Sequence, residues 1–271
     1  MIQAHSRTFR RRLQCALARR QELYLNVLRW TGSGGLEKRV YLALVREGDV
    51  VFDIGANLGH FTLLFSDLVG RRGEVHAFEP VPPTFVQLRN AVEANRQYDN
   101  VFLNQAACSA EEGNLTIQMP GDDHGQASLQ SHREGSWRTS HLVTSFETIA
   151  LKLDNYGRGE RPGSMSFVKC DVEGGELPVL LGMEATLRRC KPLLFLEVFA
   201  RWTESFGYRP VDLVDFLQAV GYDQFYSANG RLRYLADGRW AVAAEAEKTS
   251  TNLLCAVGGW HEDRLGVLSN V

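Results

Sequence analysis

The sequence contains 271 residues, of which 44% are hydrophobic and 23% are charged. These proportions are ordinary for a soluble globular protein, and the sequence has no long uninterrupted apolar segment of the kind that crosses a membrane. The length suits one large α/β domain with an N-terminal extension, or two small domains. The first residues lack the apolar core and cleavage site of a signal peptide, and the five cysteines form no C-x-x-C pair. We therefore expect a cytoplasmic protein with reduced thiols.

Charge is distributed unevenly along the chain. Residues 1–30 contain seven arginines and one acid, Glu22, which gives this segment a balance of +6. The formal net charge of the whole chain is −2, so the remaining residues carry −8. A basic arm on an acidic body could bind a membrane surface or an acidic partner. Because Arg-rich helix faces commonly stay solvated, we favour a solvated surface.

Two helices are predicted before the first strand. Apolar residues recur at near-helical spacing over residues 7–30, which predicts an amphipathic helix. The segment TGSGG at 31–35 ends it, and a second helix is predicted over residues 36–45. We assign residues 1–46 to an N-terminal helical extension and residues 47–271 to the main domain.

The most informative stretch runs from Val50 to Gly59 and reads VVFDIGANLG. An apolar run that is closed by glycines and followed by helical spacing predicts a buried parallel strand and its crossover helix. Gly55 and Gly59 allow the backbone to turn tightly and to approach a ligand. The free N–H groups at the start of the helix favour an anionic or polar partner.

The next strand identifies the kind of ligand. Residues 74–78 predict a second strand, which ends in Glu79, where a carboxylate can accept hydrogen bonds from two ribose hydroxyls. A dinucleotide fingerprint requires a glycine where this chain has Asn57, which would crowd a pyrophosphate. S-Adenosylmethionine, with its adenosine and small zwitterionic tail, fits better. A ligand-free strand–turn–helix is the alternative, and Asp53 together with Glu79 argues against it.

The middle of the chain predicts a strand, a hairpin and a long loop. After a helix opened by Pro80, Pro82 and Pro83, a third strand is predicted over residues 101–109, with the adenine ring near its tip. Residues 114–119 and 141–146 predict the two arms of an antiparallel hairpin. The loop between them has no hydrophobic periodicity and contains polar and aromatic side chains, namely His124, Ser128, His132 and Trp137. Both a binding loop and a mobile surface loop stay open.

Carboxylates follow the fourth predicted strand, residues 165–170. Asp171 and Glu173 come directly after it, where open α/β sheets bind their ligands. Glu176 is better explained as a first-turn carboxylate that interacts with the dipole of the next helix. A fifth strand at 193–198 contains Glu197 near its end. A helix at 211–220, a short pair of strands within 224–235 and a last strand at 252–257 complete the pattern.

Several of these segments together resemble the FkbM-type methyltransferases. They are VFDIGANLGHFT, HAFEPVPPTFVQLRNAVEAN, the GQASLQ loop, and FVKCDVEGGELPVLLGM followed by LLFLEV. The match extends from about Val50 to Val198, and its most specific part is D-V-E-G-x-E with Gly182 downstream. The chain departs from the family at Phe146-Glu147, where a Leu-Asp pair is common. The N-terminal helix lies outside the match.

The resemblance implies a class I S-adenosylmethionine-dependent methyltransferase. Its fold is α/β and Rossmann-like, with a mainly parallel seven-stranded sheet, helices on both faces, an N-terminal helical extension and an inserted β-hairpin. The implied reaction is O-methylation of a hydroxyl on a sugar, glycoside or natural product. We expect the cofactor, S-adenosyl-L-methionine, to be bound by nine residues, namely Asp53, Gly55, Ala56, Asn57, Gly59, Glu79, Pro80, Ala106 and Asp171.

Methyl transfer from a sulfonium depends mostly on alignment of the acceptor oxygen, and a base assists because an alcohol is a poor nucleophile. We assign Asp171, Glu173 and His124 as catalytic candidates, with Glu197 and His132 as further possible bases. A metal ion could instead acidify the hydroxyl, with Asp171 and Glu173 as ligands. No third ligand stands at a compelling spacing, so we assign no metal ligands, and a metal stays open as the less favoured alternative.

The residues after the fourth predicted strand also bear on rival functions. Base methylation of nucleic acids usually accompanies a D/N-P-P-Y/F tetrapeptide, and this chain has D-V-E-G there, so we expect no nucleic acid partner. A non-catalytic nucleoside-binding sensor or scaffold stays open, as do a methyltransferase of another small-molecule class and a homo-oligomer. We expect a small-molecule hydroxyl acceptor, with the helix at residues 7–30 packed on the core and bounding the acceptor pocket, because an isolated helix of this length is marginal in water.

Overall fold

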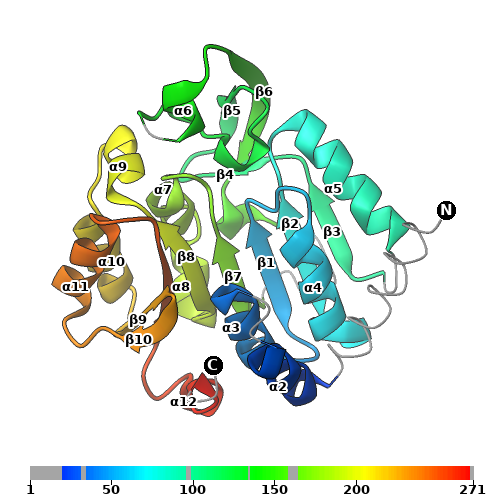
Figure 1. The fold of residues 1–271 in the computed structure, drawn as a ribbon, viewed down its shortest axis with the longest axis vertical. Helices are drawn as coiled ribbons and strands as arrows, with labels where there is room; N and C mark the ends of the chain where they lie inside the picture. The colour runs from blue at the N-terminus through cyan, green and yellow to red at the C-terminus, as the bar shows by residue number, and fades with distance from the viewer. Residues whose placement is uncertain (1–19, 32–34, 96–98, 134, 158–163, 269–271) are drawn as a thin grey trace.

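The computed structural model describes residues 20–31, 35–95, 99–133, 135–157 and 164–268. A central sheet of eight strands crosses this part of the chain, with helices on both faces (Figure 1). In spatial order the strands are β10 (Arg231–Tyr234), β9 (Gln224–Asn229), β11 (Thr251–Ala256), β8 (Leu193–Val198), β7 (Phe167–Cys170), β1 (Val50–Ile54), β2 (Glu74–Phe78) and β3 (Val101–Asn104). The five strands from β8 to β3 run parallel, whereas β11 is antiparallel to both β8 and β9.

This arrangement confirms the expected α/β, mainly parallel class I methyltransferase fold. The sheet has one strand more than expected, because β10 forms a hairpin with β9, pairing Arg231 with Asn229 and Tyr234 with Tyr226. The pair of strands predicted within 224–235 is therefore present, and it extends the sheet at its edge.

Strand β1 lies between β2 and β7, with all five of its residues buried. The chain moves from β1 outward to β2 and β3, then returns to the other side of β1 as β7 and β8. The strand order therefore reverses between β1 and β7, which is the place where open parallel sheets bind ligands beyond the carboxyl ends of their strands. Ile54 is paired with Phe78 on one side and with Cys170 on the other, so the segments that follow all three strands meet.

Each face of the sheet buries its own core. One face packs Val168 and Leu194 against four helices, which are α7 (Glu176–Leu181), α8 (Glu184–Cys190), α10 (Pro210–Ala219) and α11 (Gly238–Ala246). The other face packs Phe167 and Phe195 against α2 (Gln21–Thr31), α3 (Leu36–Leu44) and α4 (His60–Val69), and α5 (Pro82–Ala94) covers β2 and β3. Figure 1 shows α2, α3 and α4 in front of the sheet.

Tyr41 fixes α3 to the sheet. The side chain is fully buried, and its ring centroid lies 4.9–5.8 Å from those of four phenylalanines on α4, β7 and β8, namely Phe61, Phe65, Phe167 and Phe195. Burial of one such aromatic side chain contributes about 1.5–3 kcal/mol. Residues 7–19 of the predicted first helix lie outside the described residues. Its described part, α2, packs beside α3, and α2 contributes no residue to the cavity described below.

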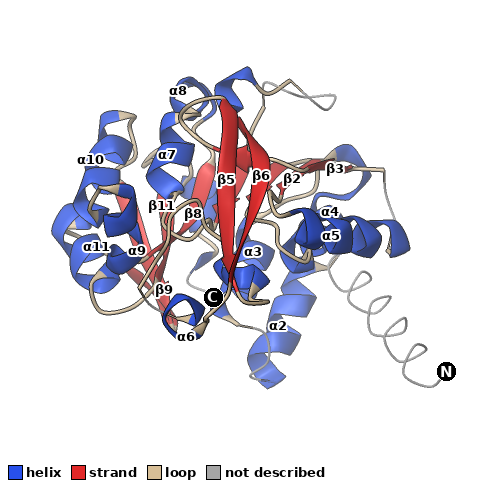
Figure 2. Ribbon diagram, turned by 90° about the horizontal axis from the view of Figure 1, so that it is seen from above, coloured by secondary structure: helices blue, strands red, loops and turns tan. Residues whose placement is uncertain are grey.

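A second sheet of three strands, ordered β4 (Ala107–Cys108), β6 (Val143–Leu151) and β5 (Gly113–Pro120), lies above the carboxyl ends of the central strands (Figures 1 and 2). β5 and β6 form the predicted hairpin, with longer arms than expected. The predicted third strand at 101–109 is divided, because the chain leaves the central sheet after Asn104 and β4 pairs with β6 instead.

Short helical segments complete the described chain. The loop between β5 and β6 contains η2 (His124–Gln126) and α6 (Ser136–Thr139), and a bridge between Gln118 and Ser128 holds it against β5. The remaining turns are η1 (Gly70–Arg72), η3 (Leu153–Asn155), α9 (Ala200–Thr203), η4 (Glu204–Phe206) and α12 (Glu262–Leu265). Within the described ranges, no helix combines the length and apolarity needed to pass through a bilayer.

Candidate active site

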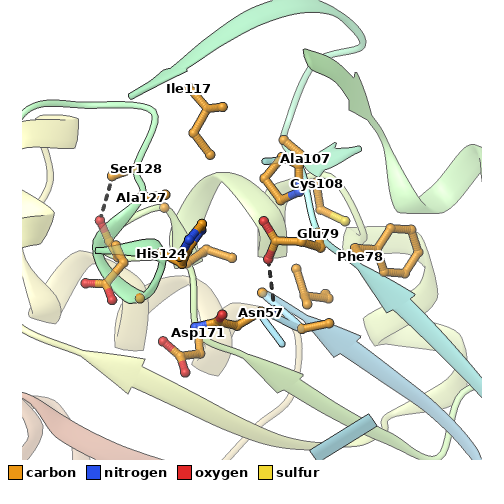
Figure 3. A pocket seen from close by; sticks show the side chains of 18 of the residues that line it. Asn57, Phe78, Glu79, Ala107, Cys108, Ile117, His124, Ala127, Ser128 and Asp171 are labelled. Carbon is orange, nitrogen blue, oxygen red and sulfur yellow. Dashed lines mark hydrogen bonds between the residues drawn. The ribbon is translucent and has the colours of Figure 1, made fainter. Parts of the chain in front are cut away.

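A cavity of about 210 Å³ lies beyond the carboxyl ends of β1, β2 and β7 (Figure 3). Its floor comes from the turns after these strands, and its roof comes from Ile117 on β5 and from the loop between β5 and β6. The lining includes most of the residues expected to bind the cofactor, which are Gly55, Ala56, Asn57, Glu79, Pro80, Ala106 and Asp171. The three candidate bases, Asp171, Glu173 and His124, line it as well.

Gly55 allows the ends of β1 and β7 to come together. The residue has φ +79°, and a Cβ added to it would lie 1.8 Å from the backbone oxygen of Asp171. The amides of Gly55 and Ala56 both donate to the carbonyl of Phe78, at 3.1 and 3.0 Å, which ties the turn to β2. The close approach that requires glycine here is thus one between two strands of the protein.

Gly59 lies outside the cavity lining. It has φ +83°, and an added Cβ would lie 2.7 Å from Cδ1 of Leu88 on α5. The glycine therefore allows α4 to begin close to α5. Its expected contact with the cofactor stays a prediction.

Glu79 is held at the tip of β2 by backbone hydrogen bonds. The amides of Asn57 and Val81 donate to its two carboxylate oxygens at 3.0 and 2.9 Å, and Figure 3 shows the bond from Asn57. Only 5% of the residue is exposed, and burial raises the pKa of Glu79 to about 7 against the opposing effect of these two hydrogen bonds. Each oxygen keeps a lone pair that can accept a hydroxyl proton.

Asn57 follows the turn in the left-handed conformation, with φ +48°, which asparagine adopts more readily than most residues. Its side-chain oxygen Oδ1 is buried and has no hydrogen-bond partner among the described residues. A buried carbonyl oxygen without a partner is costly, so a ligand that donates a hydrogen bond would be stabilised here.

Asp53 and Lys169 form a buried charged pair at the cavity floor, where Lys169 belongs to the lining. The hydroxyl of Thr62 donates to Oδ2 of Asp53 at 2.6 Å, and Nζ of Lys169 lies 3.7 Å from Oδ1. Asp53 is fully buried and is not among the described residues that line the cavity. Burial raises the pKa of Asp53, although Lys169 and Thr62 oppose it. Its predicted contact with the cofactor is untested, and its observed partners are protein groups.

Sequence reasoning missed Lys169. Its Nζ donates to Oδ2 of Asp171 at 3.1 Å and to the carbonyl oxygen of Gly55 at 3.4 Å. Burial lowers the pKa of Lys169, but the negative charges of Asp171 and Asp53 outweigh burial and hold it above its usual value. A lysine within the apolar run FVKC was the available signal, because a buried lysine needs acidic partners.

The two acids after β7 differ in their surroundings. The side chain of Asp171 is 38% exposed, and although burial alone would raise its pKa, Lys169 holds that pKa below the usual value. Glu173 is only 8% exposed, and burial together with neighbouring acids such as Asp171 raises its pKa to about 11. Asp171 is therefore ionised at neutral pH, whereas Glu173 holds a proton when no cation is nearby.

Glu176 holds the turn that carries these acids. Its Oε1 accepts hydrogen bonds from the amides of Val172 and Gly174, both at 3.2 Å, at the start of α7. Glu176 thus closes the turn that precedes α7, while Oε2 of Glu173 has no hydrogen-bond partner within the described chain. The hydroxyl of Ser128 donates to the backbone carbonyl of Glu173 at 3.1 Å and joins the loop to the turn.

The loop between β5 and β6 is folded over the cavity. Nδ1 of His124 lies 2.7 Å from Oγ1 of Thr84, which is fully buried on α5, and His124 faces the cavity (Figure 3). His132 is buried, with Nε2 3.0 Å from Oγ of Ser128, and burial lowers its pKa. Nε1 of Trp137 donates to the carbonyl of Gln126 at 3.0 Å. His124 therefore faces a ligand, whereas His132 and Trp137 hold the loop.

A third carboxylate joins Asp171 and Glu173. Glu197 on β8 lies beside them because β8 is the neighbour of β7, and one oxygen atom from each residue lies within 4.8 Å of the other two. The hydroxyl of Ser250 donates to Oε1 of Glu197 at 2.6 Å. The sequence assigns no metal ligands because it shows no third candidate, and the structure supplies one.

Comparisons with known proteins agree with this geometry. The model of the methyltransferase FkbM domain matches residues 53–223. The 31-O-demethyl-FK506 methyltransferase FkbM of Streptomyces tacrolimicus is 31% identical over 166 residues, covering 52% of this chain and 61% of that protein. The hexuronic acid methyltransferase AglP of Haloferax volcanii is 30% identical over 179 residues, covering 66% and 65%. The chain thus spans less than two thirds of the length of either relative.

A crystal structure of the methyltransferase FkbM from Methylobacillus flagellatus KT is also similar, with 16% identity, a TM-score of 0.47 and coverage of 76% of this chain and 43% of that one. The family model covers more than half of the sequence, and its range includes the turns after β1, β2 and β7 that form the cavity. The resemblance seen in the sequence is confirmed. The chain belongs to the FkbM methyltransferase family.

Proposed function

We propose that this protein transfers a methyl group from S-adenosylmethionine to a hydroxyl of a sugar, glycoside or natural product. The observation that carries the proposal is that one cavity is lined by two kinds of polar group. Asn57 and Glu79 offer acceptors for a nucleoside, and the acids Asp171 and Glu173 line the same cavity. S-Adenosylmethionine supplies a methyl group on a positively charged sulfur, which is already a good leaving group.

The residues at the ends of β1 and β2 fit this cofactor. Glu79 retains lone pairs for the two ribose hydroxyls. Oδ1 of Asn57 is a buried acceptor with no partner among the described residues, so it can bind a donor of the ligand. Small and apolar groups of the lining, Ala106, Ala107 and Phe78, leave room for a flat aromatic base. The set suits a ligand with hydroxyl and amino donors better than it suits a pyrophosphate.

The acceptor hydroxyl would be held by the acids of the turn after β7. Asp171 is ionised and partly exposed to the cavity, so it can accept a hydrogen bond from the hydroxyl and align its oxygen. Alignment provides most of the rate gain in such a transfer. His124 is the alternative base, because it lines the cavity and Thr84 fixes its ring, with the tautomer deciding whether Nε2 accepts or donates.

The two relatives support the class of acceptor. One is described by its action on 31-O-demethyl-FK506, which places the transferred methyl on oxygen, and the other by its action on a hexuronic acid, a sugar. We therefore favour a polyhydroxylated small molecule as the acceptor. The second sheet and the β5–β6 loop, which roof the cavity, are the parts that would select it.

A turnover assay tests the proposal. The purified protein is incubated with S-adenosylmethionine and a panel of glycosides, uronic acids and macrolides, and S-adenosylhomocysteine formation is followed. We expect acceptor-dependent formation with at least one compound, at a methylated oxygen identified by mass spectrometry. Stoichiometric binding of S-adenosylhomocysteine without turnover on any acceptor would favour a non-catalytic binding protein. Tighter binding of NAD than of S-adenosylhomocysteine would refute the cofactor assignment.

A further inference from the structure

The geometry points to a binding site for a hard divalent cation, such as Mg²⁺, Mn²⁺ or Ca²⁺, formed by Asp171, Glu173 and Glu197. The three residues come from the end of β7, from the turn after it and from β8, and their oxygen atoms lie within 4.8 Å of one another. Cation binding is a property of these side chains alone. A role for the cation in catalysis rests on the methyltransferase function proposed above.

Glu173 provides an observation that is independent of the clustering. The residue is 8% exposed, and its Oε2 is buried without a hydrogen-bond partner among the described residues. The amides of the turn cannot serve it, because Glu176 already accepts from those of Val172 and Gly174. A buried carboxylate oxygen without a partner is costly unless a cation or a donor satisfies it. The carboxylate of Glu173 has one oxygen within 4.8 Å of oxygens of Asp171 and Glu197, so a cation held by the three acids would satisfy it.

The cationic side chain near Glu173, that of Lys169, is already paired with two other carboxylates. Lys169 donates to Asp171 at 3.1 Å and lies 3.7 Å from Asp53, so its single charge is shared between these two carboxylates. Other acids add to the negative field at Glu173, and they are Glu176 on α7 and Asp123 in the loop. A doubly charged ion would stabilise the ionised forms of Glu173 and Glu197 together, which the single charge of Lys169, shared between Asp171 and Asp53, cannot do.

The type and spacing of the ligand atoms select the class of cation. Carboxylate oxygens are typical ligands of Mg²⁺, Mn²⁺ and Ca²⁺, whereas softer metals prefer imidazole or thiolate. Two oxygens on opposite sides of Ca²⁺ are about 4.6–5.2 Å apart, and on opposite sides of Mg²⁺ about 4.0–4.2 Å, at twice the usual bond lengths. A set that lies within 4.8 Å therefore fits around Ca²⁺, whereas Mg²⁺ would require its oxygens to lie within about 4.2 Å of one another. Ser250 orients Glu197 by donating to its Oε1, as second-shell groups do at metal sites.

The site lies at the edge of the reaction cavity. Asp171 and Glu173 both line the cavity, so an acceptor hydroxyl beside them is within reach of a cation that they bind. A bound divalent ion lowers the pKa of an attached hydroxyl. This role would explain why the turn carries Asp171 and Glu173 in addition to Glu176, the acid that accepts from the amides of Val172 and Gly174.

Binding of Mn²⁺, followed by electron paramagnetic resonance, tests the site on the full chain. We expect the wild-type protein to bind one Mn²⁺ per chain and Mg²⁺ or Ca²⁺ to compete for it. Glu173→Gln and Glu197→Gln should each weaken Mn²⁺ binding by at least about tenfold, the scale seen even for groups that only support metal ligands. Glu204→Gln, which removes an exposed carboxylate on η4 outside the set, should leave the affinity unchanged.

Retained binding of S-adenosylhomocysteine shows that each variant is folded. Equal Mn²⁺ affinity in the wild type and both variants, or no binding at millimolar Mn²⁺, would overturn the inference. The proposed function fails separately. If turnover is undiminished in EDTA and no Mn²⁺ binds, the cation site is refuted and the methyltransferase function stands. If both variants weaken Mn²⁺ binding but no acceptor supports turnover, the cation site stands and the proposed function is refuted.

Discussion

The two groups of carboxylates that meet at the cavity differ in what holds them. On the proposed cofactor side, both oxygens of Glu79 accept backbone amides, and Gly55 and Ala56 are tied to β2 by hydrogen bonds, although Oδ1 of Asn57 has no partner among the described residues. On the proposed acceptor side, Oε2 of Glu173 is buried without a partner in the described part of the chain, and three carboxylates lie within 4.8 Å of one another. The carboxylate of the first group is held by the backbone. The second group is assembled from side chains of different strands and turns, and we expect its mutation to affect catalysis more than folding.

The largest expected effect is at Asp171. Asp171→Asn keeps the size of the side chain but removes the charge that aligns the acceptor hydroxyl. It should therefore lower turnover by about 10²–10⁴-fold while folding and cofactor affinity stay near normal. The measurements are S-adenosylhomocysteine formation with an acceptor found in the panel and calorimetry of cofactor binding. A folded variant with wild-type turnover would show that Asp171 has no part in the reaction, and a lowered melting temperature with normal turnover would assign it a structural role.

Substitution of Gly55 should lower the stability of the fold, whereas Asp171→Asn should lower turnover. Gly55→Ala places a Cβ 1.8 Å from the carbonyl oxygen of Asp171 at φ +79°, so β1 and β7 must move apart. We expect a loss of about 3 kcal/mol or more in the free energy of unfolding, from overpacking and backbone strain combined. Gly48→Ala is the matched control, because Gly48 has φ +87° and nothing within 4 Å of an added Cβ.

Gly48→Ala should lose only the free energy needed to hold alanine in the left-handed conformation, about 1–2 kcal/mol. Urea unfolding of both variants measures the difference. If Gly55→Ala cost no more than Gly48→Ala, the close approach of β1 and β7 would not be what requires glycine at position 55.

The same contrast explains which features could be predicted from sequence. The β1 turn, the second strand and Glu79 follow from a local pattern of apolar residues, glycines and one acid, so they are recognisable within thirty residues of sequence. The division of the third strand was not visible, because β4 leaves the central sheet to pair with β6, whose residues come much later in the chain.

The acceptor side depends even more on contacts between distant residues. Lys169 lies in an apolar run, and its partners Asp53 and Asp171 become evident only when β1 and β7 are adjacent. Glu197 becomes a neighbour of Glu173 only because β8 pairs with β7. Spacing along the chain carries no information on such a cluster, which is why a third carboxylate beside Asp171 and Glu173 was not expected.

A smaller effect is expected at Glu79. Glu79→Ala removes the acceptor of the ribose hydroxyls and should weaken binding of S-adenosylhomocysteine by about 1.5–3 kcal/mol, the scale for hydrogen bonds that involve a charged group. The same change frees the amides of Asn57 and Val81, so the melting temperature should be recorded alongside calorimetry. An affinity equal to that of the wild type would remove Glu79 from the cofactor site.

The smallest expected effect is a pH dependence of cofactor binding. Burial raises the pKa of Glu79 from 4.5 to about 7, so in the folded protein the carboxyl binds a proton more tightly than in the unfolded chain. The contribution of Glu79 to the free energy of unfolding should therefore decline as pH rises from 4.5 to 7. Above pH 7 this contribution is fully lost. Ligand binding should follow the opposite trend, because only the ionised carboxylate can accept two hydroxyl protons. Of the nearby charges, Lys169 lowers the pKa of Glu79 and Asp53 raises it, so their effects partly cancel.

Affinity for S-adenosylhomocysteine should then fall as pH drops below 7, approaching about tenfold, or 1.4 kcal/mol, per pH unit. Glu79→Gln cannot titrate and keeps one acceptor oxygen, so it serves as the control whose affinity should not change between pH 5.5 and 8. Calorimetry of both proteins across this range measures the difference. If the wild type were also independent of pH, Glu79 would be ionised throughout, and its backbone hydrogen bonds would then outweigh its burial.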